Sequence, residues 1–388
     1  MKGLPTEIDF VVIGAGVAGL RAAIELAETG RVLVVSKKAI PSFEATDWKS
    51  EAAWLSDEDQ VSLHLQDTLN AGDGLCNPEV VKVLVDEGAQ RIDELMAWGK
   101  HDETNLVFEL ENQHTRVRVL HCRGGSTGKE LLRLLYSRAR SLKHISIVEF
   151  AFVSGLRSDA GRITGVSLID EKGVLHQIAC SAVLLATGGM GQLYRNTTDP
   201  ESATADGFAL AVRAGAEVRD LEFIQFHPTA LYMKKAPRFL LEEGLRSEGA
   251  YLRNFELDRF MGKYHPLGER APRDLVSRAI VHEMEVSRAK DPFAYLDLTH
   301  LSATKVQKRF PRVYGACMAY NVDITEDLIP VRPAAAYSVG GVRTDLDGAT
   351  SVPGLYAAGE VAMNGVHGAN RLPGNSLLAA LVCGARAG

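Results

Sequence analysis

The first forty positions combine an apolar run over residues 8–13, three closely spaced glycines, a mixed apolar and polar stretch, and a second apolar run over residues 31–35. This pattern predicts a strand, a glycine turn, a helix and a second strand. Gly14 permits the tight turn, Gly16 lets a diphosphate approach the backbone, and Gly19 lets the helix pack against the strand. The glycine motif alone is weak, but its strand and helix context predicts a dinucleotide-binding unit.

The hydrophobic pattern predicts further elements in the first half of the chain. Apolar residues at helical spacing indicate two helices over residues 61–99. A capped start at Thr127 indicates a helix that reaches Ser141 and is followed by a strand over residues 145–150. A small antiparallel insertion is predicted by three β-rich stretches, at residues 152–157, 163–170 and 174–178.

Two later apolar runs end in small residues, at 182–189 and 354–361. Together with the opening strand they predict an α/β fold with a discontinuous, Rossmann-like nucleotide-binding domain. The segment between them is rich in Arg, Glu, His and aromatic residues and predicts an inserted α+β capping domain. The expected boundaries are residues 1–220 and 337–388 for the nucleotide-binding domain and 221–336 for the cap. Hinges near Asp220 and Tyr337 would let the cap move.

Composition excludes several classes of protein. The 388 residues are 46% hydrophobic and carry a formal net charge of -6, with a pI near 6.0. Because neither Lys nor Arg is in excess, neither nucleic acid nor an anionic membrane surface is an expected partner. No apolar run has the length of a membrane span and no signal-peptide core opens the chain, so a cytoplasmic location is expected. The five cysteines form no CxxC pair and the histidines have no zinc-site spacing, so neither disulfides nor a metal is expected.

Five motifs, specific when they occur together, place the chain in a known family. They are Gln225–Leu231 (QFHPTAL), Gly244–Ala250 (GLRSEGA), Ala271–Asp274 (APRD), His367–Leu372 (HGANRL) and Asn375–Leu377 (NSL). By these motifs the chain resembles the L-aspartate oxidase family, within the larger group of the flavoprotein subunits of succinate dehydrogenase and fumarate reductase. The resemblance covers essentially all 388 residues. It also implies a C-terminal helical domain, which the sequence ending at Gly388 does not include.

The resemblance implies FAD as a non-covalent cofactor. The residues that it assigns to FAD are Gly14, Ala15, Gly16, Val17, Ala18, Gly19, Lys37, Asp206, Glu360, Ser376 and Leu377. A helix that starts at Asn375 would direct its positive N-terminal end at the flavin ring, which favours an anionic reduced flavin. A capping carboxylate at a strand end is the alternative for Glu360. Lys37 stands where NAD enzymes carry a carboxylate, and residues 42–54 contain no histidine for a covalent flavin link.

A small C4 dicarboxylate or amino-dicarboxylate is the substrate that the resemblance implies. Guanidinium and imidazole groups bind carboxylates through charge-assisted hydrogen bonds. The matching motifs supply Arg246, Arg273, Arg371, His227 and His367. Carboxylate binding is expected of Arg371, with a structural ion pair as the alternative. It is also expected of His227, with a hydrogen-bonded core histidine as the alternative.

Catalysis is assigned by the same resemblance to Arg273, Glu243 and Arg246. Arg273 matches the proton-transfer residue of the family. Because the pKa of arginine exceeds about 12, this role requires a dehydrated, positively charged setting and a carboxylate relay, for which Glu243 is the candidate. A plain substrate-binding or structural cation is the alternative for Arg273. Glu111 matches the acid that meets the amino group of aspartate, with a surface glutamate as the alternative.

The sequence departs from the family pattern at three places, which together comprise five residues. Lys49, Ser50 and Glu51 replace small residues in a loop that lies along the flavin in the family. Ala336 stands in place of a substrate-binding histidine, and Glu242 in place of a small hydroxyl residue. Each change removes a contact or adds a negative charge, so together they bear directly on activity.

The implied reaction is the FAD-dependent oxidation of L-aspartate to iminosuccinate, with the flavin reoxidised by oxygen or by fumarate. Its product would supply quinolinate synthase in NAD biosynthesis. Two alternatives stay open. One is a divergent relative that has lost oxidase activity and acts as a binding or partner subunit. The other is a fumarate or enoate reductase, which needs an electron donor that the chain does not encode.

Overall fold

A five-stranded parallel sheet forms the centre of the computed structural model, which describes residues 4–40, 52–53, 60–99, 106–109, 114–122 and 127–388. The strand order is β17-β10-β1-β2-β6, and every neighbouring pair is parallel. The strands are β1 (Phe10–Ile13), β2 (Val32–Val35), β6 (Ile145–Val148), β10 (Ala182–Leu185) and β17 (Leu355–Ala357). Each lies inside an apolar run that predicted a strand, which confirms the Rossmann-like sheet.

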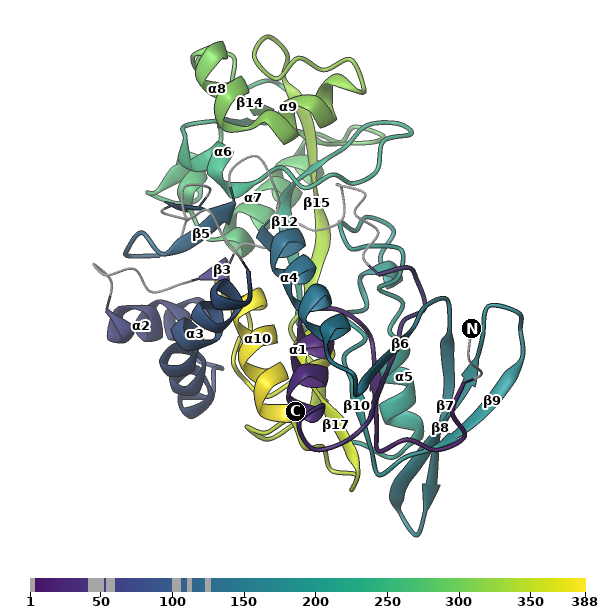
Figure 1. Ribbon diagram of the computed structural model, residues 1–388. Helices are drawn as coiled ribbons and strands as arrows, with labels where there is room; N and C mark the ends of the chain where they lie inside the picture. Colours follow the sequence, from purple (N-terminus) through teal and green to yellow (C-terminus); the bar gives the residue numbers. More distant parts are fainter. Residues whose placement is uncertain (1–3, 41–51, 54–59, 100–105, 110–113, 123–126) are drawn as a thin grey trace.

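Side chains of the central strands alternate between two cores. Val12, Val34 and Leu184 face a helical layer, whereas Val11 and Leu33 face the opposite side. Burial on both faces explains why these strands are continuous apolar runs in the sequence. The helical layer consists of α1 (Val17–Leu26), α3 (Pro78–Trp98), α4 (Thr127–Ser141) and α10 (Asn375–Ala387), with α2 (Val61–Ala71) against α3 (Figure 1).

The opposite face of the sheet is covered by an antiparallel three-stranded sheet and a short helix. These elements are β7 (Phe152–Asp159), β8 (Arg162–Ile169), β9 (Leu175–Ala179) and α5 (Asp206–Arg213). The antiparallel sheet confirms the insertion that the β-rich stretches predicted. It projects from the far side of the parallel sheet from the helices in Figure 1.

The cap is a separate α+β unit with its own hydrophobic core. Its antiparallel sheet has the order β12-β15-β14-β13, and Figure 1 shows it at the end of the molecule remote from β7–β9. The strands are β12 (Ile224–Leu231), β13 (Tyr251–Arg253), β14 (Ala294–Asp297) and β15 (Ile329–Ser338), and the helices are α6 (Glu243–Ser247), α7 (Arg273–Val286), α8 (Ala303–Arg309) and α9 (Pro311–Met318). The structure therefore confirms an inserted α+β capping domain, while its exact boundaries stay a prediction.

Short elements complete the fold. Two small sheets contain β11 (Val218–Arg219), β16 (Gly341–Arg343) and β18 (Ala362–Met363), and β3 (Ala52–Ala53), β5 (Val119–Cys122) and β4 (Leu106–Glu109). The 3-10 turns are η2 (Gly191–Leu193), η3 (Met261–Lys263), η4 (Gly268–Arg270) and η5 (Gly359–Val361). Across the described ranges, no helix is both long and apolar enough to cross a membrane.

The two predicted hinge positions lie in different settings. Asp220 connects β11 to β12 in a left-handed conformation, with φ of 57°. Tyr337 lies inside β15, which continues to Ser338 and pairs with β12. The boundary at residue 337 therefore falls within a continuous strand, and movement there stays a prediction.

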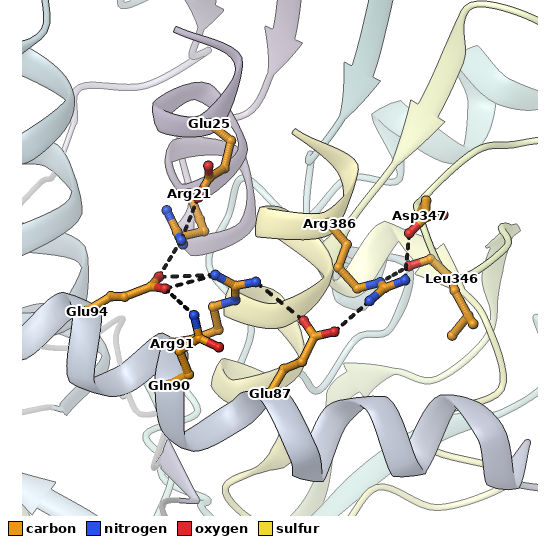
Figure 2. Close-up of polar contacts among 9 residues, drawn as sticks. All are labelled: Arg21, Glu25, Glu87, Gln90, Arg91, Glu94, Leu346, Asp347 and Arg386. Carbon is orange, nitrogen blue, oxygen red and sulfur yellow. Dashed lines mark hydrogen bonds and ion pairs between the residues drawn. The ribbon is translucent and has the colours of Figure 1, made fainter. Parts of the chain in front are cut away.

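A chain of ion pairs joins three helices of the helical layer (Figure 2). Arg21 of α1 is only 2% exposed and donates to Glu94 of α3 at 2.5 Å. Arg91 binds both Glu94 and Glu87 on the same helix, and Glu87 accepts from Arg386 of α10 at 2.6 Å. The network contacts α1 at Arg21 and α10 near its end at Arg386, so it links both helices to α3.

Candidate functional site

A cavity of about 380 Å³ extends from the parallel sheet to the cap. Residues that follow the carboxyl ends of β1, β2, β10 and β17 line its sheet side, where open α/β sheets bind their ligands. His227, Leu240, Arg273 and Ala336 line its cap side. A single cavity therefore brings together the two groups of residues that the sequence assigned to cofactor and substrate.

The turn between β1 and α1 has the structure that the glycine spacing predicted. Gly14 has φ of 110°, and a Cβ there would lie 2.1 Å from the carbonyl oxygen of Ala186. A Cβ on Gly19 would lie 2.0 Å from the carbonyl oxygen of Gly14. A Cβ on Gly16 would meet nothing within 4 Å, because that position faces the cavity just before α1 begins at Val17. The turn thus has open space beside a helix N-terminus, which is the setting of a diphosphate site.

Lys37 and Asp206 lie together at the sheet side of the cavity. The Nζ of Lys37 donates to Oδ2 of Asp206, the first residue of α5, and to Oγ1 of Thr204 at 2.6 Å. Lys37 and Asp206 both line the cavity, whereas Thr204 does not. The structure therefore pairs two residues, 169 positions apart, that the resemblance had assigned separately to the cofactor.

The start of α10 is held in place by buried hydrogen bonds. Asn375 is fully buried, its Oδ1 lies 2.8 Å from Nε2 of His64, and its Nδ2 donates to Oγ1 of Thr68 at 2.9 Å. The two following residues, Ser376 and Leu377, line the cavity. The positive end of this helix therefore faces the cavity, and its direction toward a flavin ring stays a prediction.

Arg371 lies between an aromatic ring and the start of α10. Its Nη1 donates to Oγ of Ser376 at 3.1 Å, and its Cζ lies 4.4 Å from the ring centre of Tyr337. The backbone carbonyl of Arg371 accepts from Nε2 of Gln225 at 2.8 Å. These contacts fix a guanidinium group at the cavity wall, where it can bind an anion.

Arg273, Glu243 and Arg246 form a buried charge cluster. The Oε1 of Glu243 accepts from Nε of Arg273 and from Nη2 of Arg246, each at 2.7 Å. Glu243 and Arg246 are 1% exposed and Arg273 is 6% exposed. Although burial alone would raise it, the pKa of Glu243 is held below its usual value by the charges of Arg273 and Arg246. Of the three, only Arg273 reaches the cavity lining.

His227 lies on β12 and is 1% exposed. Its Nδ1 accepts the backbone N–H of Thr229 at 3.3 Å, so the neutral ring carries its proton on Nε2. The side chain lines the cavity from the cap. This geometry gives the ring one anchored nitrogen and one donor nitrogen.

His367 occupies a different position from the other predicted substrate ligands. Its Nε2 lies 3.2 Å from the hydroxyl of Tyr337, and the residue lines a separate small pocket behind the main cavity. Burial, with the charge of Arg371 adding to it, lowers the pKa of His367 to about 3, so the ring is neutral. In this structure His367 supports Tyr337, whose ring in turn lies under Arg371.

Two acids also line the cavity near Arg371. The Oε1 of Glu360 accepts the backbone N–H of Ser338 at 2.8 Å. Burial raises the pKa of Glu360 to about 8, with a further contribution from the neighbouring Asp199. Burial likewise raises the pKa of Asp199 to about 6, against the opposing charge of Arg371. Glu360 was predicted from the sequence, whereas Asp199 was not.

The remaining predicted positions are distributed as follows. Glu111 and the departures at Lys49, Ser50 and Glu51 lie outside the described residues. Ala336 lines the cavity beside Tyr337. At the start of α6 stands Glu242, which is not among the described residues that line the cavity.

These residues fit FAD. The open space beside Gly16 at the start of α1 suits a diphosphate, and the start of α10 faces the same cavity. Lys37 and Asp206 offer polar groups on the sheet side, and Glu360 offers another nearer the cap. The cavity continues past these groups to His227 and Arg273, which leaves room for a second, anionic ligand.

Comparison with known proteins agrees with this fit. A family model described as an FAD binding domain matches residues 9–377. The fold and the cavity therefore define an FAD-dependent oxidoreductase. The L-aspartate oxidase of Streptomyces coelicolor is 45% identical to this chain over 397 residues, which cover 98% of this chain and 67% of that protein. That of Caulobacter vibrioides is 44% identical, over 97% of this chain and 75% of that protein.

Solved structures give the same result. A chain of E. coli quinol fumarate reductase matches 98% of this chain and 69% of its own length, with a TM-score of 0.90 and 32% identity. The chain thus spans roughly two thirds to three quarters of the length of these relatives. It belongs to the L-aspartate oxidase family of FAD-binding flavoproteins.

Sequence reasoning missed two residues of the site. Tyr337 was considered only as a hinge position, yet its ring contacts Arg371 and its hydroxyl contacts His367. Asp199 lies in a loop of turn residues with no motif to mark it, and only tertiary structure brings it beside Arg371. For Tyr337, the available signal was its place directly after Ala336, because the family pattern had already marked Ala336 as a substrate-binding position.

Proposed function

We propose that this chain oxidises L-aspartate to iminosuccinate with FAD as its cofactor. The observation that carries the proposal is the continuous cavity that joins the dinucleotide turn at Gly16 to Arg273, Arg371 and His227. An enzyme of this kind needs its substrate within reach of the flavin, and one cavity with a cofactor end and a cationic end meets that need. Bound FAD would accept a hydride from the α-carbon of the substrate and pass electrons to oxygen or fumarate.

Arg371 and His227 would bind the substrate's carboxylates. The guanidinium of Arg371 is held by Ser376 and the Tyr337 ring, so it is already oriented before a ligand arrives. His227 would present its Nε2–H, because its Nδ1 is committed to the backbone of Thr229. Two donors that line one cavity suit a ligand with a carboxylate at each end.

Arg273 would bind the substrate or exchange a proton with it. Glu243 would hold the Arg273 side chain in place for either role. Arg273 reaches the cavity, whereas Glu243 lies behind it and is shared with Arg246. The second oxygen of Glu243, Oε2, is buried and accepts no hydrogen bond from any described residue. A proton would pass between Arg273 and Glu243 along the hydrogen bond from Nε to Oε1.

Oxidase activity is tested by measuring the reaction products. In air, the FAD-loaded protein given L-aspartate should release hydrogen peroxide, together with ammonia as the imine hydrolyses. Without oxygen, added fumarate should restore turnover and yield succinate. Absence of L-aspartate-dependent peroxide from protein that retains FAD would refute the proposal.

A dicarboxylate reductase is the second candidate, and it rests on the 32% identity and TM-score of 0.90 to E. coli quinol fumarate reductase. The same cationic end of the cavity would bind fumarate. Fumarate-dependent reoxidation of chemically reduced protein, without reduction by L-aspartate, would favour it. A binding or partner subunit without turnover is favoured if FAD binds and neither reaction occurs.

We also infer that the product supplies quinolinate synthase at the first step of NAD biosynthesis, in the cytoplasm. Membership of the L-aspartate oxidase family supports this role. The test is complementation of a bacterial strain that lacks its own L-aspartate oxidase, in medium without nicotinic acid. Growth supports the role, and failure of a well-expressed, FAD-loaded protein to restore growth contradicts it.

A further inference from the structure

The buried face of α2 is unusually polar. Its buried residues are His64, Asp67, Thr68 and Ala71, which lie on one side of the helix because they are spaced by three or four residues. A surface helix normally buries an apolar stripe instead. Burial of a polar group costs free energy unless the group is hydrogen-bonded, so the partners of these side chains indicate what the face does.

Two side chains of this face hold Asn375, the first residue of α10. The Nδ2 of Asn375 donates to Oγ1 of Thr68 at 2.9 Å, and that hydroxyl donates to the backbone carbonyl of His64 at 2.8 Å. Because the hydroxyl has no second proton, only one orientation of the Asn375 amide satisfies both groups. Its Oδ1 therefore accepts a hydrogen bond from Nε2 of His64, at 2.8 Å.

Asp67, on the same face, is linked to the turn before α10 through two further side chains. Its Oδ2 accepts from Nη1 of Arg118, and the same Nη1 donates to Nδ1 of His114 at 3.0 Å. The Nε2 of His114 donates to the backbone carbonyl of Pro373 at 2.9 Å. Burial lowers the pKa of His114 to about 3, so its neutral ring accepts at one nitrogen and donates at the other.

The end of α2 holds the segment that carries Arg371. The Nδ2 of Asn370 donates to the backbone carbonyl of Ala71 at 3.1 Å, and the N–H of Ala369 donates to the carbonyl of Gly72 at 3.0 Å. Contacts from α2 and its end therefore lie on both sides of Arg371 in the sequence. One helix thus fixes the segment from Ala369 to the start of α10.

The start of α10 is open on its cavity side. Ser376 and Leu377 line the cavity, and the preceding Gly374, with φ of 81°, has no side chain to cap the helix. The first N–H groups of a helix have no partner within it, and they favour negative charge nearby. A flavin ring at this position would therefore be stabilised in its anionic reduced form.

We propose that the polar face of α2 positions the start of α10 for the flavin: His64 and Thr68 act through Asn375, and the position they enforce raises the reduction potential of bound FAD. This role rests on the proposed function, because it takes the flavin ring to lie at the start of α10. Neither His64 nor Thr68 is among the described residues that line the cavity, so both are positioning residues.

The test measures the midpoint potential of FAD in the loaded protein, by stepwise chemical reduction beside a reference dye without oxygen. His64→Leu removes the donor to Asn375, and Thr68→Val removes the hydroxyl with little change in shape. In each variant the preference of the site for reduced over oxidised flavin should fall about three- to tenfold, which lowers the potential by about 15 to 30 mV for a two-electron couple. A merely structural role would lower thermal stability and leave the potential unchanged.

His64→Gln is the conservative variant, and Gln66→Leu is the matched control. A glutamine side chain has an N–H donor that can reach Asn375, so His64→Gln should recover at least half of the potential lost in His64→Leu. Gln66 is exposed on the same helix and donates to Asn70 at 2.8 Å, so Gln66→Leu also removes one side-chain hydrogen bond. It should leave the potential unchanged.

An unchanged potential in an FAD-loaded His64→Leu or Thr68→Val variant overturns the inference, and so does an equal shift in Gln66→Leu. If neither variant binds FAD, the face of α2 has only a structural role, which also overturns it. Failure of the proposed function is separable, because the potential is measured with a chemical reductant. Lowered potentials without reduction by L-aspartate refute only the oxidase activity, whereas reduction by L-aspartate with unchanged potentials refutes only the inference.

Discussion

The Nε of Arg273 donates to Oε1 of Glu243 at 2.7 Å, although the two residues lie 30 positions apart and both are more than nine-tenths buried. Arg246 donates to the same oxygen, so one carboxylate balances two guanidinium groups. Because Arg273 begins α7 and Arg246 lies in α6, this carboxylate also joins two helices of the cap. The cluster therefore serves both the stability of the cap and the position of Arg273 in the cavity.

Glu243→Gln should destabilise the protein far more than the loss of an exposed ion pair does, and it should also slow turnover. Removal of the negative charge takes a shared carboxylate partner from two buried guanidinium groups, which costs about 3 to 5 kcal/mol in the free energy of unfolding. Turnover with L-aspartate should fall by about 100-fold or more if proton transfer is also lost. Asp274→Asn, which breaks an exposed ion pair with Arg278 on the same helix, should change stability by less than about 1 kcal/mol. Equal effects of the two substitutions on urea unfolding would contradict the account.

Substitution by alanine should weaken FAD binding at Gly16 and protein stability at Gly19. Gly16→Ala adds a methyl group where nothing lies within 4 Å, so the apoprotein should keep its stability. The same methyl group projects into the cavity, and FAD affinity should fall by about tenfold or more. Gly19→Ala places a Cβ 2.0 Å from the carbonyl oxygen of Gly14 and should destabilise the apoprotein by about 1 to 3 kcal/mol. Thermal unfolding and fluorescence titration with FAD measure both effects, and normal FAD binding by Gly16→Ala would refute the diphosphate position.

The buried histidines predict loss of stability in acid. Burial lowers the pKa of His114 to about 3, and its ring lies 2.9 Å from the carbonyl oxygen of Pro373. The unfolded chain binds a proton below about pH 6.5, whereas the folded protein does not. Stability is therefore full above that pH and falls as the pH drops toward 3, by up to about 1.4 kcal/mol per pH unit for such a group.

His114→Gln should flatten this dependence, and the exposed His282→Gln should not. Urea unfolding of the apoprotein at pH 5 and pH 7.5 gives the comparison. His367, whose pKa is also lowered to about 3, adds a second contribution that the His114 variant retains. An identical pH dependence in His114→Gln and the unaltered protein would show that this ring does not govern acid stability.

The ion-pair network of Figure 2 predicts that two substitutions on α3 differ in their effect on the free energy of unfolding. Glu94→Gln takes a charged partner from Arg21, which is 2% exposed, and should cost about 1 to 3 kcal/mol of unfolding free energy. Asp86→Asn breaks an exposed pair with Lys82 on the same helix and should cost less than about 1 kcal/mol. Denaturant unfolding of both variants provides the measurement, and a Glu94 variant no less stable than the Asp86 variant would contradict the structural role of the network.

Local sequence patterns were sufficient for the parallel sheet and its glycine turn. The burial of a strand and the lack of space for a Cβ at Gly19 both depend on residues close in sequence. Hydrophobic periodicity and glycine spacing therefore predict them. Motifs likewise located Arg273 and Arg371 at one cavity. The buried Arg21 was not predicted, because its partner Glu94 lies 73 positions away and nothing in the sequence links them.

The substrate end of the site depended more on tertiary structure. His367 lies in the same motif as Arg371, yet a turn of the backbone directs it toward Tyr337 and away from the cavity lining. Asp199 lies in the loop between β10 and α5, which backbone hydrogen bonds such as that from Ala205 to Gly189 close on itself, and Arg371 follows more than 170 residues later in the chain. Short motifs specify which residue types are present, whereas the direction of each side chain depends on elements distant in the sequence.

If this cavity holds FAD and L-aspartate together, L-aspartate reduces the flavin, and one anaerobic spectrum shows whether it does. The FAD-loaded protein is recorded in the visible range before and after addition of L-aspartate, without oxygen. The flavin absorbance maximum should disappear with L-aspartate, and it should disappear much more slowly in an Arg371→Gln variant that still binds FAD. An unchanged spectrum in the unaltered, FAD-loaded protein would contradict it.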